Sequence, residues 1–181
     1  TRVRELHTVA PRTVKLVPRG AVHDFTDIAT ELAASEFHGE FGGARPWPAL
    51  GWGRAAPSRS RRSLRLGSFD SVTKSVRVHP VLDSADAPRW FVRYVMFHEL
   101  LHAVLDAPHD GRARRRHHGP DFRAREQAFA DTARALDWQR EQIRALIRCA
   151  RAGKPFELAA RPARKSRLRS ALSWVQTTLF D

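Results

Sequence analysis

The segment Pro88 to Leu105, PRWFVRYVMFHELLHAVL, carries apolar side chains on most sides of a predicted helix. Three residues just ahead of it can cap this helix: Asp83, Ser84 or Asp86. Pro88 fits the first turn, where a missing N–H costs nothing. A helix with so broad an apolar surface is predicted to be largely buried. Two histidines and a glutamate within it therefore need an explanation.

The pattern H-E-x-x-H explains them, with His98 and His102 on one helical face and Glu99 beside it. Both imidazoles can then bind one metal ion, and Glu99 is a candidate general base. The alternative is two core histidines and a glutamate satisfied by hydrogen bonds, which would bury three titratable groups at a considerable desolvation cost. The pattern predicts a catalytic Zn²⁺ site, where the ion lowers the pKa of a water molecule to about 7.

A catalytic zinc site usually takes three protein ligands and leaves a fourth position open. The metzincin pattern needs Gly and His at positions where this chain has Leu105 and Pro108, which excludes that class. Glu126 is placed to be the third ligand in the class that takes a glutamate from the following helix. We prefer His118, because Pro120 marks the first turn of a helix and a histidine just before it can point inward.

The sequence HELLH at 98–102, followed after an arginine-rich loop by HGPDF at 118–122, resembles the SprT-like metallopeptidases, which include the Spartan proteases that degrade proteins crosslinked to DNA. The resemblance extends upstream through Leu32 to Trp52, LRLGSF at 64–69 and VRVHPVL at 76–82, and covers about residues 20 to 150. It implies a zincin-like domain in which His98, His102 and His118 hold zinc and Glu99 is the base. The chain departs from some members in lacking a C-terminal cysteine zinc ribbon.

The remaining pattern predicts an α+β fold, in which the zinc-binding helix packs with a small β-sheet and flanking helices. The expected elements are a helix over 24–37, a hairpin with strands at 63–69 and 75–79, and a helix from Pro120 that continues, with or without a break, to about Ala152. We expect an N-terminal arm at 1–19, the SprT-like domain at 20–153, and a basic, flexible tail at 154–181.

The charge balance favours a polyanionic partner. The chain has 181 residues with 32 Lys and Arg against 19 Asp and Glu, a formal net charge of +13, and such a field favours DNA or another acidic surface. The single cysteine, Cys149, excludes an intramolecular disulfide framework and is compatible with a reducing compartment. No run of 18 apolar residues occurs. We therefore expect a cytoplasmic, nucleoid-associated protein without a membrane partner.

Two further residues near the metal motif have open roles. Tyr94 lies one turn before His98 and could stabilise the oxyanion that develops during amide attack, or it could be a core residue. His117 could replace His118 as a ligand, hydrogen-bond it, or be a solvated loop residue.

Two other stretches suggest contacts with DNA and with a protein partner. Trp52 could stack on single-stranded DNA and an arginine run could neutralise its phosphates; the alternatives are a core role for Trp52 and a mobile loop for the arginines. The arginines are Arg59, Arg61 and Arg62. A C-terminal group resembles the bacterial sliding-clamp-binding peptide, although this segment could instead fold back onto the domain. The group is Gln176, Leu179 and Phe180.

Three functional hypotheses follow. The preferred one is a zinc metallopeptidase that cleaves DNA-bound or DNA-crosslinked proteins in DNA repair. The second is a metallopeptidase of a free regulatory protein, in which the basic charge is incidental. The third is a non-catalytic adaptor with a structural zinc site, bound to DNA or to the sliding clamp. Glu99 argues against the adaptor, because a structural site has no need of a base.

Overall fold

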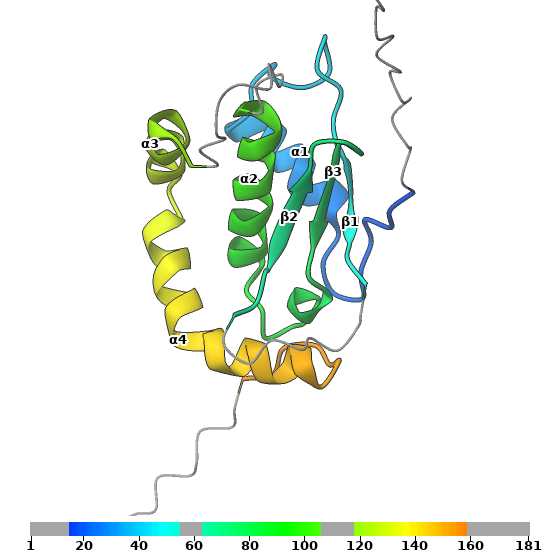
Figure 1. Ribbon diagram of the computed structural model, residues 1–181, viewed down its shortest axis with the longest axis vertical. Coiled ribbons are helices and arrows are strands. Elements are labelled where there is room, and N and C mark those ends of the chain that lie inside the picture. The colour runs from blue at the N-terminus through cyan, green and yellow to red at the C-terminus, as the bar shows by residue number, and fades with distance from the viewer. Residues whose placement is uncertain (1–14, 55–62, 106–117, 159–181) are drawn as a thin grey trace, which may run out of the picture.

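The structure is a computed structural model that describes residues 15–54, 63–105 and 118–158 (Figure 1). This part of the chain is mixed α+β, with four α-helices, one short 3-10 helix and a three-stranded sheet, which confirms the predicted fold class at that level. In chain order the elements are α1 Phe25–Ser35, β1 Ala49–Trp52, β2 Gly67–Asp70, β3 Ser75–Val78, η1 Pro80–Leu82, α2 Arg89–Leu105, α3 Pro120–Ala128 and α4 Thr132–Arg151.

The sheet has the strand order β1-β3-β2. β1 runs parallel to β3, whereas β2 pairs with β3 antiparallel, with Gly67 opposite Val78 and Asp70 opposite Ser75. The predicted hairpin is therefore confirmed, with a shorter first strand. Its turn is closed by the Asp70 carboxylate, which accepts hydrogen bonds from the backbone N–H groups of Val72 and Thr73. Because β3 lies in the middle of the strand order, β2 lies at one edge of the sheet.

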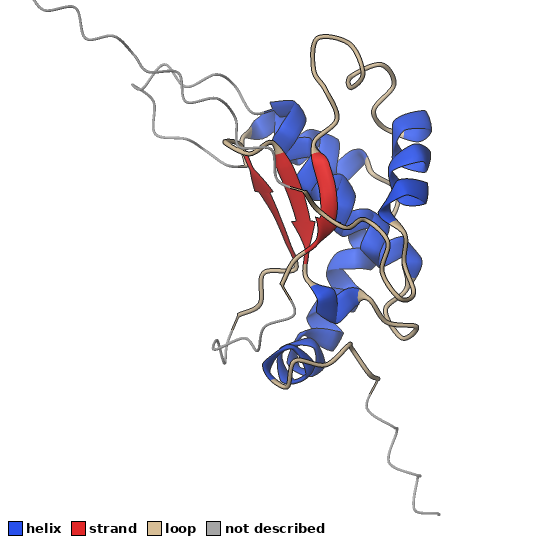
Figure 2. Ribbon diagram, turned by 90° about the vertical axis from the view of Figure 1, so that its right-hand side faces the viewer, coloured by secondary structure: helices blue, strands red, loops and turns tan. Residues whose placement is uncertain are grey.

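Helices α1 and α2 cover one face of this sheet, as Figure 2 shows from the side. Asp24 caps α1 through the backbone N–H of Thr26, and Phe25, Ile28 and Leu32 are buried. α2 is buried over most of its surface, as its sequence predicts, including at Phe91 and Leu100. Even so, no helix in the described ranges combines the length and the apolarity needed to cross a bilayer.

A break divides the second helical region into α3 and α4. Phe129, at the break, is buried and stacks on Phe97 of α2, with ring centroids 4.1 Å apart and planes at 15°. The hydroxyl of Thr132 donates to the backbone carbonyl of Glu126 and secures the turn. The sequence left a break open, and the burial of Phe129 against α2 is the physical reason for it.

Packing continues past the boundary predicted at residue 153. Phe156 is fully buried, and its backbone N–H donates to the carbonyl of Val81 at 2.8 Å. Ser84 donates to the Phe156 carbonyl, and the Asp86 carboxylate accepts from the N–H of Leu158. Asp83 accepts from three backbone N–H groups of residues 21–23. The prediction that one of these three side chains caps α2 is therefore wrong, because α2 begins only at Arg89 and they bind the backbone of residues 21–23, 156 and 158 instead.

Candidate metal centre

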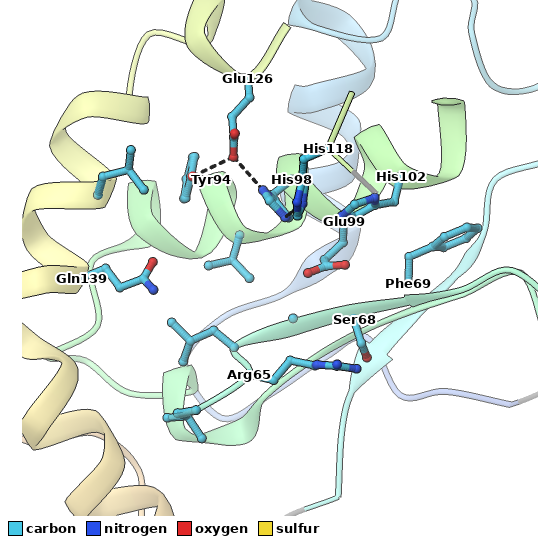
Figure 3. A pocket seen from close by; sticks show the side chains of 15 residues that line it. Arg65, Ser68, Phe69, Tyr94, His98, Glu99, His102, His118, Glu126 and Gln139 are labelled. Atoms are coloured by element: carbon cyan, nitrogen blue, oxygen red, sulfur yellow. Dashed lines mark hydrogen bonds and ion pairs between the residues drawn. The ribbon is translucent and has the colours of Figure 1, made fainter. Parts of the chain in front are cut away.

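Three histidines converge at one end of the cavity between α2, α3 and β2 (Figure 3). His98 and His102 come from one face of α2, and His118 lies two residues before the first turn of α3. Their nearest ligand atoms all lie within 4.8 Å of one another, which is close enough to hold a metal ion. The preference for His118 over other downstream residues is thus matched by the geometry.

The spacing of the ring nitrogens fits one tetrahedral ion. Nε2 of His98 lies 3.4 Å from Nε2 of His118. Two nitrogen ligands about 2.0–2.1 Å from a tetrahedral zinc ion would lie about 3.4 Å apart. Three imidazoles with a fourth position left for water or substrate are the donor set that zinc takes in catalytic sites, so the residues present fit the ion.

Glu126 fixes the orientation of His98. Nδ1 of His98 donates to Oε1 of Glu126 at 2.7 Å, and the hydroxyl of Tyr94 donates to the same oxygen at 3.0 Å (Figure 3). With Nδ1 carrying the proton, the lone pair on Nε2 faces the other two histidines. The hydrogen bond from His98 is the main cause that lowers the pKa of Glu126, which therefore stays ionised as an acceptor.

This arrangement changes two of the roles considered from sequence. The carboxylate of Glu126 is engaged with His98 and Tyr94, so it orients a ligand and is not the third ligand itself. Tyr94 is 5% exposed, and burial, followed by the nearby Glu126 carboxylate, raises the pKa of its hydroxyl. Tyr94 therefore remains protonated and donates to Glu126. This role differs from both roles considered from sequence, the oxyanion donor and the core residue without a polar function.

Glu99 is held between α2 and the edge strand. It is 7% exposed, and its carboxylate is hydrogen-bonded by the backbone of Phe69 in β2. Burial raises the pKa of this carboxyl, against smaller opposing effects of His98, the Phe69 hydrogen bond and Arg65. A carboxylate with a raised pKa beside the three histidines is suited to accept and return a proton.

The close approach of Glu99 to β2 depends on Gly67. A Cβ added at Gly67 would lie 2.6 Å from Oε1, 2.7 Å from Cγ and 3.0 Å from Cδ of Glu99. Contacts that short do not occur, so any side chain at this position would displace the carboxylate. In the sequence this glycine is one residue of LRLGSF at 64–69, and nothing there shows which side chain faces it.

Phe122 supports all three histidine rings. Its ring, 3% exposed, lies with its centroid 5.0 Å from that of His98 and 4.6 Å from those of His102 and His118. Sequence reasoning missed this role. The available signal was the four-residue spacing from His118, which lies two residues before α3, to Phe122 in the first turn of α3.

The histidines and Glu99 line a cavity of about 650 Å³. Its walls come from α2, α3, α4 and the segment that leads into β2. The other lining residues are Leu64, Arg65, Leu66, Gly67, Ser68, Phe69, Tyr94, Val95, Glu126, Leu136 and Gln139. The site is therefore large enough to take part of a polypeptide.

The remaining sequence candidates are not part of this centre. His117, the run Arg59, Arg61 and Arg62, and the C-terminal group Gln176, Leu179 and Phe180 all lie outside the described residues. The Trp52 ring packs on Phe25, with centroids 4.2 Å apart, and its buried indole N–H has no partner in the described part of the chain. This packing agrees with the core role for Trp52.

Comparison of the chain with protein-family models, with curated proteins and with solved structures gave no match in any of the three. The geometry of the site itself is therefore the basis on which a function can be assigned to this chain.

Proposed function

We propose that this protein is a zinc-dependent metallopeptidase with a zincin-like domain of the SprT type. One observation carries the proposal: three imidazoles face a common point while the buried carboxylate of Glu99 lies in the same cavity. A structural zinc site would close its fourth position with another ligand and would not need a base. The convergence of His98, His102 and His118 with Glu99 favours hydrolysis.

The residues divide the chemistry between them. His98, His102 and His118 would hold zinc, which supplies a Lewis acid that polarises the scissile carbonyl and lowers the pKa of water. Glu99 accepts the proton of the attacking water and returns it to the leaving amine. An extended substrate would lie along β2, the edge strand that adjoins Glu99.

The charge distribution supports substrates that are bound to DNA. The segments 1–14, 55–62, 106–117 and 159–181 contain 15 of the 32 Lys and Arg residues but four of the 19 Asp and Glu residues. The described ranges are nearly balanced, with 17 basic and 15 acidic residues. Segment 106–117, with four arginines, joins α2 directly to His118. Basic charge tethered at the metal centre would concentrate the enzyme on nucleic acid, and we propose a nucleoid-associated location on the same ground.

The test is cleavage of a DNA-binding protein by zinc-loaded enzyme, with no DNA, single-stranded DNA or double-stranded DNA. The Glu99→Gln variant is the control, because it keeps the size of the side chain and the three histidines. Cleavage that needs both DNA and Glu99 is expected. DNA-independent cleavage would favour the peptidase of a free regulatory protein, whereas zinc and DNA binding without cleavage of any substrate would favour the adaptor.

A further inference from the structure

We propose that the cavity selects substrates with a large aliphatic or aromatic side chain next to the scissile bond, such as Leu, Met or Phe. This inference rests on the proposed peptidase function and names the class of polypeptide that the same site would take. Its basis is the composition of the cavity wall on the side away from the histidines.

The cavity has two chemically distinct ends. The histidines, Glu99 and Glu126 form the polar end. The other end includes Leu136 of α4, three residues before Gln139, and the lining also includes the apolar side chains of Leu64 and Leu66 before β2 and of Val95 in α2. Gln139 of α4 closes this end with a neutral amide, and Figure 3 shows it across the cavity from the histidines.

Leu136 leaves apolar surface exposed to solvent in the cavity wall. It is 46% exposed, although Ala135 beside it and Leu146 on the same helix are fully buried. A leucine in the wall of a concave site loses water contact when an apolar group enters, and this stabilises the complex in proportion to the area covered. Leu66 and Val95, which also line the cavity, are buried and already shielded from solvent.

Charged groups in the wall do not oppose this occupant. Arg65 is the basic residue of the segment that leads into β2, and in Figure 3 its side chain extends along the strand toward Ser68, away from Gln139. The carboxylate of Glu126 is engaged by His98 and Tyr94. A charged substrate side chain entering beside Leu136 would lose its hydration without gaining a partner of opposite charge, which is costly.

The apolar end begins next to the general base. Val95 lies four residues before Glu99, one helical turn of about 5.4 Å along the same face of α2. Leu66 directly precedes Gly67, whose backbone approaches the Glu99 carboxylate. When the scissile bond lies at Glu99, the side chain of the adjoining substrate residue therefore reaches the Leu136 wall, and that residue sets specificity.

Binding tests this inference without relying on turnover. The protein is the zinc-loaded, full-length Glu99→Gln variant, and the probes are fluorescein-labelled Gly-Ser peptides with one central Leu, Phe, Ala, Asp or Lys, measured by anisotropy. We expect the Leu and Phe peptides to bind about tenfold or more tightly than the Ala and Asp peptides. Equal affinities, tighter binding of a charged peptide, or no binding of any peptide would overturn the inference.

Two matched leucine variants locate the effect. Leu136→Asp in the same background is expected to reduce the preference for Leu over Asp to within about threefold and to improve binding of the Lys peptide. Leu158→Asp is the control, because Leu158 is 50% exposed and lies outside the cavity wall. An equal effect of both variants would contradict the assignment of Leu136.

Wild-type cleavage of a mixed peptide library separates the two proposals. Cleavage without apolar preference would overturn the subsite and leave the peptidase function standing. Selective binding of apolar peptides without any cleavage would overturn the peptidase function and leave the subsite standing.

Discussion

Replacing Gly67 with alanine should impair catalysis while leaving the metal centre assembled. The added Cβ would lie 2.6 Å from Oε1 of Glu99, whereas ordinary contacts begin at 3.4 Å. The carboxylate must therefore move by about 0.8 Å, and a misplacement of about 1 Å in a catalytic group can cost about 100-fold in rate. A 100-fold loss corresponds to about 2.7 kcal/mol of activation free energy. The three atoms nearest to this Cβ all belong to Glu99, and none belongs to His98, His102 or His118.

The assay compares kcat, zinc content and thermal unfolding of Gly67→Ala with those of Gly53→Ala. Gly53 is a suitable control, since its nearest contacts for an added Cβ are 3.5 Å and 3.9 Å. We expect Gly67→Ala to keep stoichiometric zinc and to lose about 100-fold in kcat, and Gly53→Ala to stay within a few-fold of wild type. A Gly67→Ala enzyme with nearly full activity would refute the argument that Gly67 positions Glu99, and so would a loss of activity explained by loss of zinc.

Three further predictions concern the surroundings of the site. Glu126→Ala removes the acceptor that orients His98, so the zinc dissociation constant should rise about 10–100-fold, measured by competition with a chelator. Glu40→Gln weakens the bidentate pair with Arg125 of α3, whose two hydrogen bonds measure 2.8 and 2.9 Å, and should raise the zinc dissociation constant about threefold to tenfold. The control is Glu31→Gln, which weakens a similar pair with Arg89, with hydrogen bonds of 2.7 Å, outside the site and should not change the zinc dissociation constant. Burial lowers the pKa of His79, so its folded-state NMR titration should have a midpoint below 6.5, and its contribution to stability should be complete above pH 6.5 and decline as the pH falls toward that midpoint.

The sequence predicted those parts of the fold that local pattern controls. The apolar helix with the H-E-x-x-H motif, the hairpin and the start of α3 at Pro120 all depend on residues within a few positions of one another. The two histidines of α2 share a face because of helical periodicity alone. This is why the first half of the metal centre could be placed without a structure.

The other half of the centre depends on contacts between distant residues. Arg125 pairs with Glu40, 85 positions earlier, and its guanidinium also donates to the carbonyl of Glu36. These bonds fix where α3 lies against the segment after α1, and in that placement Glu126 meets His98. The choice between ligand and orienting carboxylate for Glu126 was therefore beyond what spacing could decide.

The candidate metal centre is built from two series of residues, each with a four-residue spacing. On α2, Tyr94, His98 and His102 recur every four residues, and His118, two residues before α3, is followed at the same interval by Phe122 and Glu126 on α3. The second series supplies a candidate ligand, a support for the rings and the carboxylate that orients His98. Because His118 lies two residues before α3 and the other two groups lie on it, a displacement of α3 would disengage all three together, and the affinity for the ion should depend on the docking of α3. The pair between Arg125 and Glu40 does not touch the three histidines, but it holds α3 in place and so supports the geometry of the site.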